Sequence, residues 1–237
     1  MTAPAAPLPH QDRSALHDDF LGWLRFANAG MLDDGNIIAM DYALRHLPTT
    51  GAIVEIGSFC GLSTNVLTHL MRRNSHPGRP LFTCDPWLFE GADQPDVPMG
   101  DGGITFGDYR ELVKQSFIRN VRAFSRHSLP HTLEMLSEPF FEKWAEADTV
   151  IDVFDRPARL GGPIAFGYID GDHSYDQARK DFLGVDRHLV PGGFILFDDS
   201  ADGTPWEVCQ LVQELLDEPA YQLIDRFPNY LFRKKST

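Results

Sequence analysis

The sequence predicts one α/β domain with an open, mostly parallel β-sheet that helices cover on both faces. Two observations lead to this fold class. Short apolar runs that end at turn residues alternate with longer segments of helical periodicity along the 237-residue chain. The last two apolar runs, 221–227 and 230–233, are separated only by Pro228 and Asn229, which predicts a closing β-hairpin rather than another helical crossover.

Two helices are expected before the first strand. Apolar residues recur at helical spacing over 15–27 and again over 37–47. The apolar run 52–56 predicts the first strand because it ends at Gly57, and helical periodicity over 62–71 predicts the helix that follows. This β-turn-α unit is the opening of a Rossmann-like sheet.

The alternation then continues to the hairpin. The further predicted strands are 81–84, 132–135, 165–169 and 194–197. The further predicted helices are 109–124, 139–147, 175–187 and a last helix with Thr204 as N-cap and Pro205 at its first position. Strands 165–169 and 194–197 are expected to be neighbours in the sheet.

One domain is expected over 15–237, preceded by a flexible tail at 1–14. The N-terminal helices of this domain occupy 15–47. Residues 88–107 form a long connection after the second strand, and such loops are often lids over a site. The alternative for 88–107 is a flexible insertion without a function.

Composition limits the class of ligand. The net charge of −13, from 34 acidic and 21 basic residues, opposes binding to nucleic acid or to an anionic membrane. Three scattered cysteines supply neither a disulfide framework nor a thiolate metal site, which predicts a cytoplasmic location. The first residues have no signal-peptide or anchor pattern. A small-molecule ligand is therefore expected, and a homo-oligomer is left open.

The first motif is Val-Glu-Ile-Gly-Ser-Phe-Cys-Gly at 54–61, where a strand turns into a helix. Glycines at such a turn let backbone amides approach a ligand closely. The motif resembles motif I of class I S-adenosylmethionine-dependent methyltransferases, in which an acidic residue precedes three alternating glycines. The resemblance implies that Glu55, Gly57, Ser58 and Gly61 surround the amino-acid end of the cofactor.

The motif departs from the family pattern at Phe59, which stands where the central glycine is expected. A tight turn without a ligand is one alternative. A nicotinamide-dependent oxidoreductase is another, although its Gly-x-Gly-x-x-Gly spacing is absent and Glu55 is atypical of dinucleotide-binding strands.

The second motif, Asp85-Pro86-Trp87, ends the second predicted strand, where ligands bind in parallel sheets. It resembles the acidic residue that follows motif I in the family, which implies that Asp85 accepts both ribose hydroxyls and that Trp87 lies beside the cofactor. Ser137 resembles the position that contacts adenine. The alternatives are an ordinary turn for Asp85 and a helix cap for Ser137.

The third motif joins two strand ends, with Asp170, Asp172 and His173 after one and Asp198 and Asp199 after the next. It resembles the metal-dependent O-methyltransferases, including macrocin, sugar and catechol enzymes and cephalosporin-hydroxylase-like proteins. The resemblance implies that Asp170, Asp198 and Asp199 bind Mg²⁺, whose preferred ligands are hard oxygens. His173 falls where the catechol enzymes have a general-base lysine.

Several roles stay open at this third motif. The carboxylates can be turn residues without a metal, His173 can be structural, and Asp172 can orient His173 rather than contact the ion. Asp170 is also expected to contact the cofactor and to take part in catalysis together with His173.

The sequence as a whole predicts an S-adenosylmethionine-dependent methyltransferase that methylates a hydroxyl of a sugar, catechol or natural product with help from a divalent metal. The resemblance implies the class I methyltransferase fold, a seven-stranded, mostly parallel sheet that ends in a β-hairpin. A metal-independent small-molecule methyltransferase, a nicotinamide-dependent oxidoreductase and a non-catalytic ligand-binding protein of the same fold are the alternatives.

Overall fold

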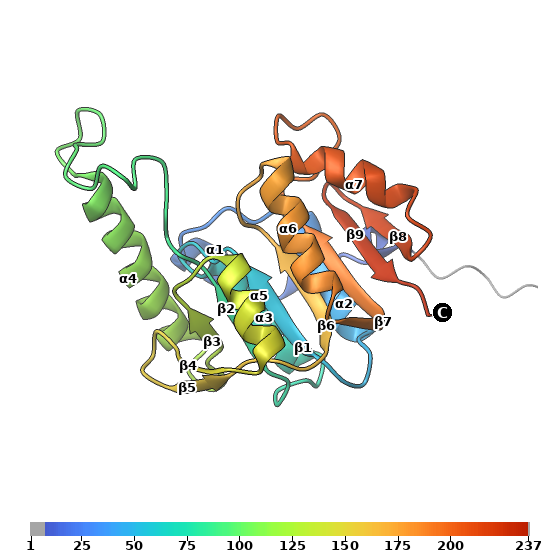
Figure 1. Cartoon of the computed structure of the whole chain (residues 1–237). Helices are drawn as coiled ribbons and strands as arrows, with labels where there is room; N and C mark the ends of the chain where they lie inside the picture. Colours follow the sequence, from blue (N-terminus) through green and yellow to red (C-terminus); the bar gives the residue numbers. More distant parts are fainter. Residues whose placement is uncertain (1–7, 237) are drawn as a thin grey trace, which may run out of the picture.

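The computed structural model describes residues 8–236 and has a seven-stranded sheet at its centre (Figure 1). The strands are β1 (Ala52–Ile56), β2 (Leu81–Cys84), β3 (His131–Leu133), β6 (Ile164–Ile169), β7 (Leu189–Phe197), β8 (Tyr221–Arg226) and β9 (Tyr230–Lys234). They follow the order β3-β2-β1-β6-β7-β9-β8. The first five are parallel, whereas β9 runs antiparallel to both β7 and β8. The predicted sheet, the adjacency of β6 and β7 and the closing hairpin are confirmed.

Helices cover both faces of the sheet, as predicted. The helices are α1 (Asp19–Ala27), α2 (Asp34–Arg45), α3 (Leu62–Arg73), α4 (Phe106–Phe124), α5 (Ser137–Glu146), α6 (Tyr175–Asp186) and α7 (Val208–Leu216). Helices α5, α6 and α7 pack on one face, in front in Figure 1, and α1, α2 and α3 pack on the other. Helix α4 lies beyond the β3 edge and packs around Trp87 and Phe154.

Strand β7 shows how the sequence produces these two cores. Phe194 and Leu196 belong to the core formed with α1, α2 and α3, whereas Ile195 and Phe197 belong to the core formed with α5, α6 and α7. Successive side chains of a strand point to opposite faces. A continuous apolar run is therefore needed where helices cover both faces, and all four residues are fully buried.

Several local bounds differ from the prediction, and the first is the start of α1. This helix begins at Asp19 rather than at 15, because the carboxylate of Asp18 accepts hydrogen bonds from the N–H groups of Phe20 and Leu21. Residues Ser14–His17 form a separate 3₁₀ helix, η2.

The start of α7 was also placed too early. Its N-cap residue is Glu207, not Thr204. The Thr204 hydroxyl instead accepts a hydrogen bond from the N–H of Trp206 at 3.5 Å, within a turn. The first helical N–H, that of Val208, donates to the carbonyl oxygen of His173 at 3.0 Å. A tertiary contact with His173 thus satisfies the first N–H of α7, which the predicted Thr204 cap was expected to satisfy.

A second, two-stranded sheet was not predicted. It pairs β4 (Thr149–Ile151) with β5 (Pro157–Arg159) in antiparallel orientation. Each strand is three residues long and mostly exposed. Such short strands have no alternation of apolar residues that could reveal them.

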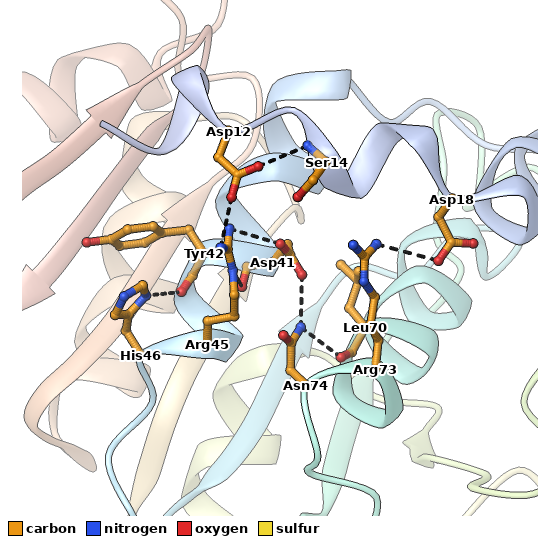
Figure 2. A network of polar contacts seen from close by, with 10 residues as sticks. All are labelled: Asp12, Ser14, Asp18, Asp41, Tyr42, Arg45, His46, Leu70, Arg73 and Asn74. Carbon is orange, nitrogen blue, oxygen red and sulfur yellow. Dashed lines mark hydrogen bonds and ion pairs between the residues drawn. The ribbon is translucent and has the colours of Figure 1, made fainter. Parts of the chain in front are cut away.

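The predicted N-terminal tail is attached to the domain in its described part. Residues Pro9–Gln11 form the 3₁₀ helix η1, and the N–H of His10 donates to Asp225 in β8 at 2.7 Å. Figure 2 shows Arg45 of α2 between Asp12 and Asp41, at 2.9 and 3.0 Å. Residues 1–7 lie outside the described residues. Residues 9–12 thus contact the domain, and the flexibility of the tail stays a prediction.

Of the segment 88–107, residues 88–105 form a chain of turns that projects beyond the N-terminus of α4, and residues 106 and 107 belong to that helix (Figure 1). Phe89, near the start of the segment, is still in contact with the body of the domain, where its ring packs edge-on against Phe59 with the ring centroids 6.1 Å apart. That this segment acts as a lid stays a prediction. No helix within residues 8–236 combines the length and apolarity needed to cross a bilayer.

Candidate active site

A cavity of about 750 Å³ opens at the carboxyl ends of the parallel strands. Its wall is formed by the loops that follow β1, β2, β3, β6 and β7, together with residues 30–33 and two side chains of α6. Ligands bind at this edge in open α/β sheets, and the volume is typical of small-molecule sites. Of the predicted site residues, Gly57, Ser58, Asp85, Ser137, Asp170, His173, Asp198 and Asp199 line the cavity.

The loop between β1 and α3 forms the middle of the wall. Gly57 has φ +81°, and a Cβ there would overlap the backbone carbonyl of Asp170. Only glycine fits, because β1 and β6 approach one another closely at this point. Phe59 has φ +44°, so the residue that replaces the family's central glycine still adopts a glycine-like backbone.

Three predicted cofactor residues lie behind the wall rather than on it. Glu55 is fully buried, accepts a hydrogen bond from the Thr64 hydroxyl at 2.5 Å, and has its pKa raised to about 7 by burial. Gly61 has φ +87° and packs against α4. The buried indole N–H of Trp87 donates to the carbonyl oxygen of Phe59 at 3.0 Å. These three residues do not line the cavity but shape the loop behind it, and a direct contact with the cofactor stays a prediction.

Asp85 holds the same loop through its carboxylate. Oδ2 accepts hydrogen bonds from the N–H groups of Ser58 and Phe59 at 2.8 and 2.9 Å, and Oδ1 accepts from Trp87 N–H at 2.6 Å. An ionised carboxylate offers about four acceptor positions. About one position, on Oδ1, is left for a ligand. That Asp85 binds the ribose stays a prediction, and its carboxylate has room for a hydrogen bond from one ribose hydroxyl rather than from both.

Asp170 and Asp198 come together at the ends of β6 and β7. Asp170 Oδ2 accepts a hydrogen bond from the Tyr168 hydroxyl at 3.2 Å. Burial raises the pKa of Asp170 well above its usual value, and the nearby negative charge of Asp198 raises it further. Within the described residues, neither carboxylate forms an ion pair with a Lys or Arg side chain. Negative charge is thus concentrated here without a cationic side chain to compensate it.

Two asparagines that the sequence did not single out hold Asp198. Its Oδ1 accepts hydrogen bonds from Asn36 Nδ2 and from Asn229 Nδ2 at 2.5 and 2.7 Å. Asn36 lies in α2, and Asn229 lies in the turn of the C-terminal hairpin. The Pro228–Asn229 pair indicated only a turn, although the side chain of Asn229 extends into the site.

Asp199 and Asp172 have different surroundings. Asp199 has φ +50°, and its Oδ2 lies 3.3 Å from His173 Nε2. Asp172 Oδ1 instead accepts a hydrogen bond from the N–H of Ser174 at 2.7 Å, next to the start of α6. Asp199, rather than Asp172, is therefore the carboxylate paired with the His173 ring.

Sequence reasoning also missed Asp181 of α6. It lines the cavity and accepts a hydrogen bond from the Ser137 hydroxyl at 2.5 Å. Burial raises its pKa to about 6. The signal was available, because Asp181 interrupts the apolar stripe of Ala178, Phe182 and Val185 at helical spacing.

The side chains that line the cavity can bind a positively charged cofactor and place a proton acceptor beside it. Seven aspartates and one histidine line the cavity, and no Lys or Arg of the described residues does. Among residues 8–236, no three His, Cys, Asp or Glu side chains are already arranged to hold a metal ion.

Comparison with known proteins shows the family and the fold of the chain. A family model described as a methyltransferase domain matches residues 54–200. The calicheamicin methyltransferase CalS11 is 17% identical, with a TM-score of 0.57 over 100% of this chain and 88% of that one. An O-methyltransferase from Bacillus cereus in complex with S-adenosylhomocysteine (SAH) is 12% identical, with a TM-score of 0.58 over 92% and 91% of the two chains.

A further similar structure is the O-methyltransferase TomG from Streptomyces achromogenes, involved in tomaymycin synthesis and solved in complex with S-adenosylmethionine. It is 12% identical, with a TM-score of 0.54 over 98% of this chain and all of that one. At such identities the structures establish the fold, and the family match covers more than half of the chain. The chain therefore belongs to the methyltransferase-domain family and is a class I S-adenosylmethionine-dependent methyltransferase.

Proposed function

We propose that this methyltransferase transfers the methyl group of S-adenosylmethionine to a hydroxyl group of a small, uncharged molecule. The charge of the cavity wall carries the proposal. Seven aspartates surround the space, and among the described residues neither Lys nor Arg lines it. Such a wall attracts the positive sulfonium of the cofactor and repels phosphate groups. The acceptor is accordingly a sugar, catechol or natural product without phosphate.

The rim of the cavity supports an acceptor with an apolar face. Met31 and Leu88 line the cavity, and their side chains are 84% and 53% exposed. Clustered exposed apolar side chains mark binding surfaces more often than isolated ones do. Trp206 lies just beyond, with its ring 5.1 Å from that of His173. A planar ring or a sugar face can pack on this rim while its hydroxyl points inward.

His173 takes the proton of the acceptor in this proposal. When its Nε2–H donates to Asp199, the other ring nitrogen, Nδ1, is the proton acceptor of the neutral imidazole. The acceptor oxygen forms a bond to the methyl carbon as the carbon–sulfur bond breaks. SAH leaves with the electron pair of that bond, and the hydroxyl proton moves to Nδ1. The domain contributes alignment of the two reactants and a base.

The chemistry of the donor set fits a divalent cation. Asp170 and Asp198 are oxygen donors in close proximity without a cationic side chain between them, and hard cations prefer such ligands. Asp170, Asp198 and Asp199 would hold the ion. When bound, it would lower the energetic cost of ionising the acceptor hydroxyl as a Lewis acid.

A metal-independent methyltransferase is the second candidate. It is favoured by the finding that no three ligating side chains within residues 8–236 are preformed around one point. In that case a proton on Asp170 relieves the repulsion between the two carboxyl groups, in keeping with the raised pKa of Asp170.

The test combines calorimetry with an acceptor screen. SAH and S-adenosylmethionine should bind the purified protein, and NAD should not. Phenols and glycosides are then offered as neutral compounds and as their matched phosphate esters, and the products are analysed by mass spectrometry. We expect some neutral acceptors to gain one methyl group and their phosphate esters to gain none. Methylation of the phosphate esters alone would contradict the assignment of the acceptor class, and absence of SAH binding would contradict the proposed function.

A further inference from the structure

Asp181 is a carboxylate on the buried face of a helix. Its exposed fraction is 1%, and Ala178 and Val185 of the same face are equally buried. A carboxylate in such surroundings is costly unless hydrogen bonds compensate it. Oδ1 receives them, from Ser137 Oγ at 2.5 Å and from Gln177 Nε2 at 3.0 Å. Both donors are fixed, because Gln177 Nε2 also donates to Ser137 Oγ at 3.0 Å.

The second oxygen of Asp181 is free. Oδ2 receives no hydrogen bond from the residues that the structure describes, although Asp181 is part of the cavity wall. Since Oδ1 is occupied by Ser137 and Gln177, Oδ2 is the atom offered to a ligand. Gly171 keeps the space beside it open, because a Cβ at that residue would lie 3.1 Å from Oδ2. Burial raises the pKa of this carboxyl to about 6, so at neutral pH the ionised form, which only accepts hydrogen bonds, predominates.

The location of Asp181 along the cavity indicates which part of a ligand it meets. The sheet order places β3 beyond β2 and β2 beyond β1. If S-adenosylmethionine is oriented as the resemblance of the motifs at 54–61 and 85–87 implies, its amino-acid end lies at Gly57 after β1 and its ribose lies at Asp85 after β2. The base then lies at the end of β3. Asp181 is held at this end through its hydrogen bond to Ser137, the first residue of α5 after β3.

The walls at this end suit a purine. Pro86, next to Asp85 in the chain, and Leu136, next to Ser137, line the same cavity as Asp181, and they offer apolar surface to the faces of an aromatic ring. Binding sites of this kind combine apolar walls with a few fixed polar groups that determine specificity.

We propose that Asp181 Oδ2 accepts a hydrogen bond from the exocyclic 6-amino group of the cofactor's adenine. This inference rests on the proposed function, because it assumes that S-adenosylmethionine occupies the cavity. Ser137 and Gln177 hold the carboxylate in position, and Asp181 makes the site specific for a purine that carries an amino group at C6.

The test measures the affinity of the full chain for SAH and for an SAH analogue that carries hydrogen in place of the 6-amino group. Wild-type protein should bind SAH about tenfold or more tightly than the analogue, since a hydrogen bond to a charged group is lost. In Asp181→Asn the amide oxygen keeps the contacts to Ser137 and Gln177, and the amide nitrogen replaces Oδ2. A donor then faces the amino group, so SAH binding should weaken and the ratio of the two affinities should fall to about one.

The matched control is Asp176→Asn, an identical substitution at an exposed residue in the first turn of α6. It should leave the ratio unchanged. If SAH binds but the ratio in Asp181→Asn equals that of the wild type, Asp181 does not recognise the amino group. If Asp181→Asn does not fold, the test rests on the affinities of the wild-type protein for SAH and for the analogue. Equal affinities for the two compounds would overturn the proposal. Failure of the wild-type protein to bind SAH at all would instead contradict the proposed function.

Discussion

His173 Nε2 lies 3.3 Å from Asp199 Oδ2, across two loops that follow neighbouring strands. The pair resembles the orientation of a catalytic imidazole by a carboxylate, which selects the ring nitrogen that can accept a proton. The carbonyl of His173 is fixed as well, by the first N–H of α7. The loop thus presents the imidazole to the cavity in one orientation.

The first prediction concerns His173 as the base. His173→Ala should lower turnover of an acceptor found in the screen by about 10²–10⁴, with SAH affinity and the midpoint of thermal unfolding nearly unchanged. Added imidazole should restore part of the lost turnover, because a free base can enter the vacated space. Turnover close to that of the wild type, or lost activity that tracks lost stability, would remove His173 from the mechanism.

The second prediction concerns Asp85 as a ribose ligand. Asp85→Asn should weaken SAH binding about tenfold or more, because a charge-assisted hydrogen bond is lost. The carboxylate also accepts hydrogen bonds from the Ser58 and Phe59 amides. An effect on the loop after β1 must therefore be distinguished from the loss of the contact to the ribose. A 2′,3′-dideoxy analogue of SAH makes this separation by calorimetry. It should bind wild type and Asp85→Asn with similar affinity if Asp85 acts on the ribose, and equal relative losses for both ligands would argue for the loop alone.

The third prediction concerns the metal. Excess EDTA should abolish methyl transfer while the dissociation constant of SAH stays the same, and added Mg²⁺ should restore activity. Asp170→Asn and Asp198→Asn should weaken Mn²⁺ binding measured by calorimetry, whereas Asp172→Asn should not, since the Asp172 carboxylate is engaged by Ser174. Full activity in EDTA would end the metal hypothesis and favour the metal-independent candidate.

The fourth prediction is a pH dependence of stability from Glu55. Its pKa is raised from 4.5 to about 7 in the folded protein, chiefly by burial. The contribution of Glu55 to stability is therefore fully present below pH 4.5 and is lost as the pH rises to about 7. Relative to Glu55→Gln, the wild type should lose up to about 3 kcal/mol over this range. Denaturant unfolding of both proteins at several pH values measures the difference, and parallel pH profiles would show that Glu55 keeps its ordinary pKa.

The strands were predictable because parallel strands covered on both faces need continuous apolar runs. The bounds of β1 and β2 agree with the predicted ones to the residue. The meeting of Asp170 and Asp198 follows from the same logic, because the carboxyl ends of adjacent parallel strands share one edge. Local hydrogen bonds were less predictable. The cap at Asp18 and the contact of Val208 with His173 moved the starts of α1 and α7.

The sequence by itself determined the fold class, the order of the elements along the chain and the edge of the sheet that carries the site, since these depend on periodicity and on residues at strand ends. Only the tertiary structure decided what each polar side chain contacts. In the folded chain, Glu55 and Trp87 are buried away from the cavity, and most hydrogen-bond acceptor positions of Asp85 are occupied by backbone amides. Asn229 reaches the site from a hairpin and Asp181 from a helix face. Such contacts join residues far apart in the chain, and their geometry depends on how the helices pack against the sheet, which no local pattern encodes.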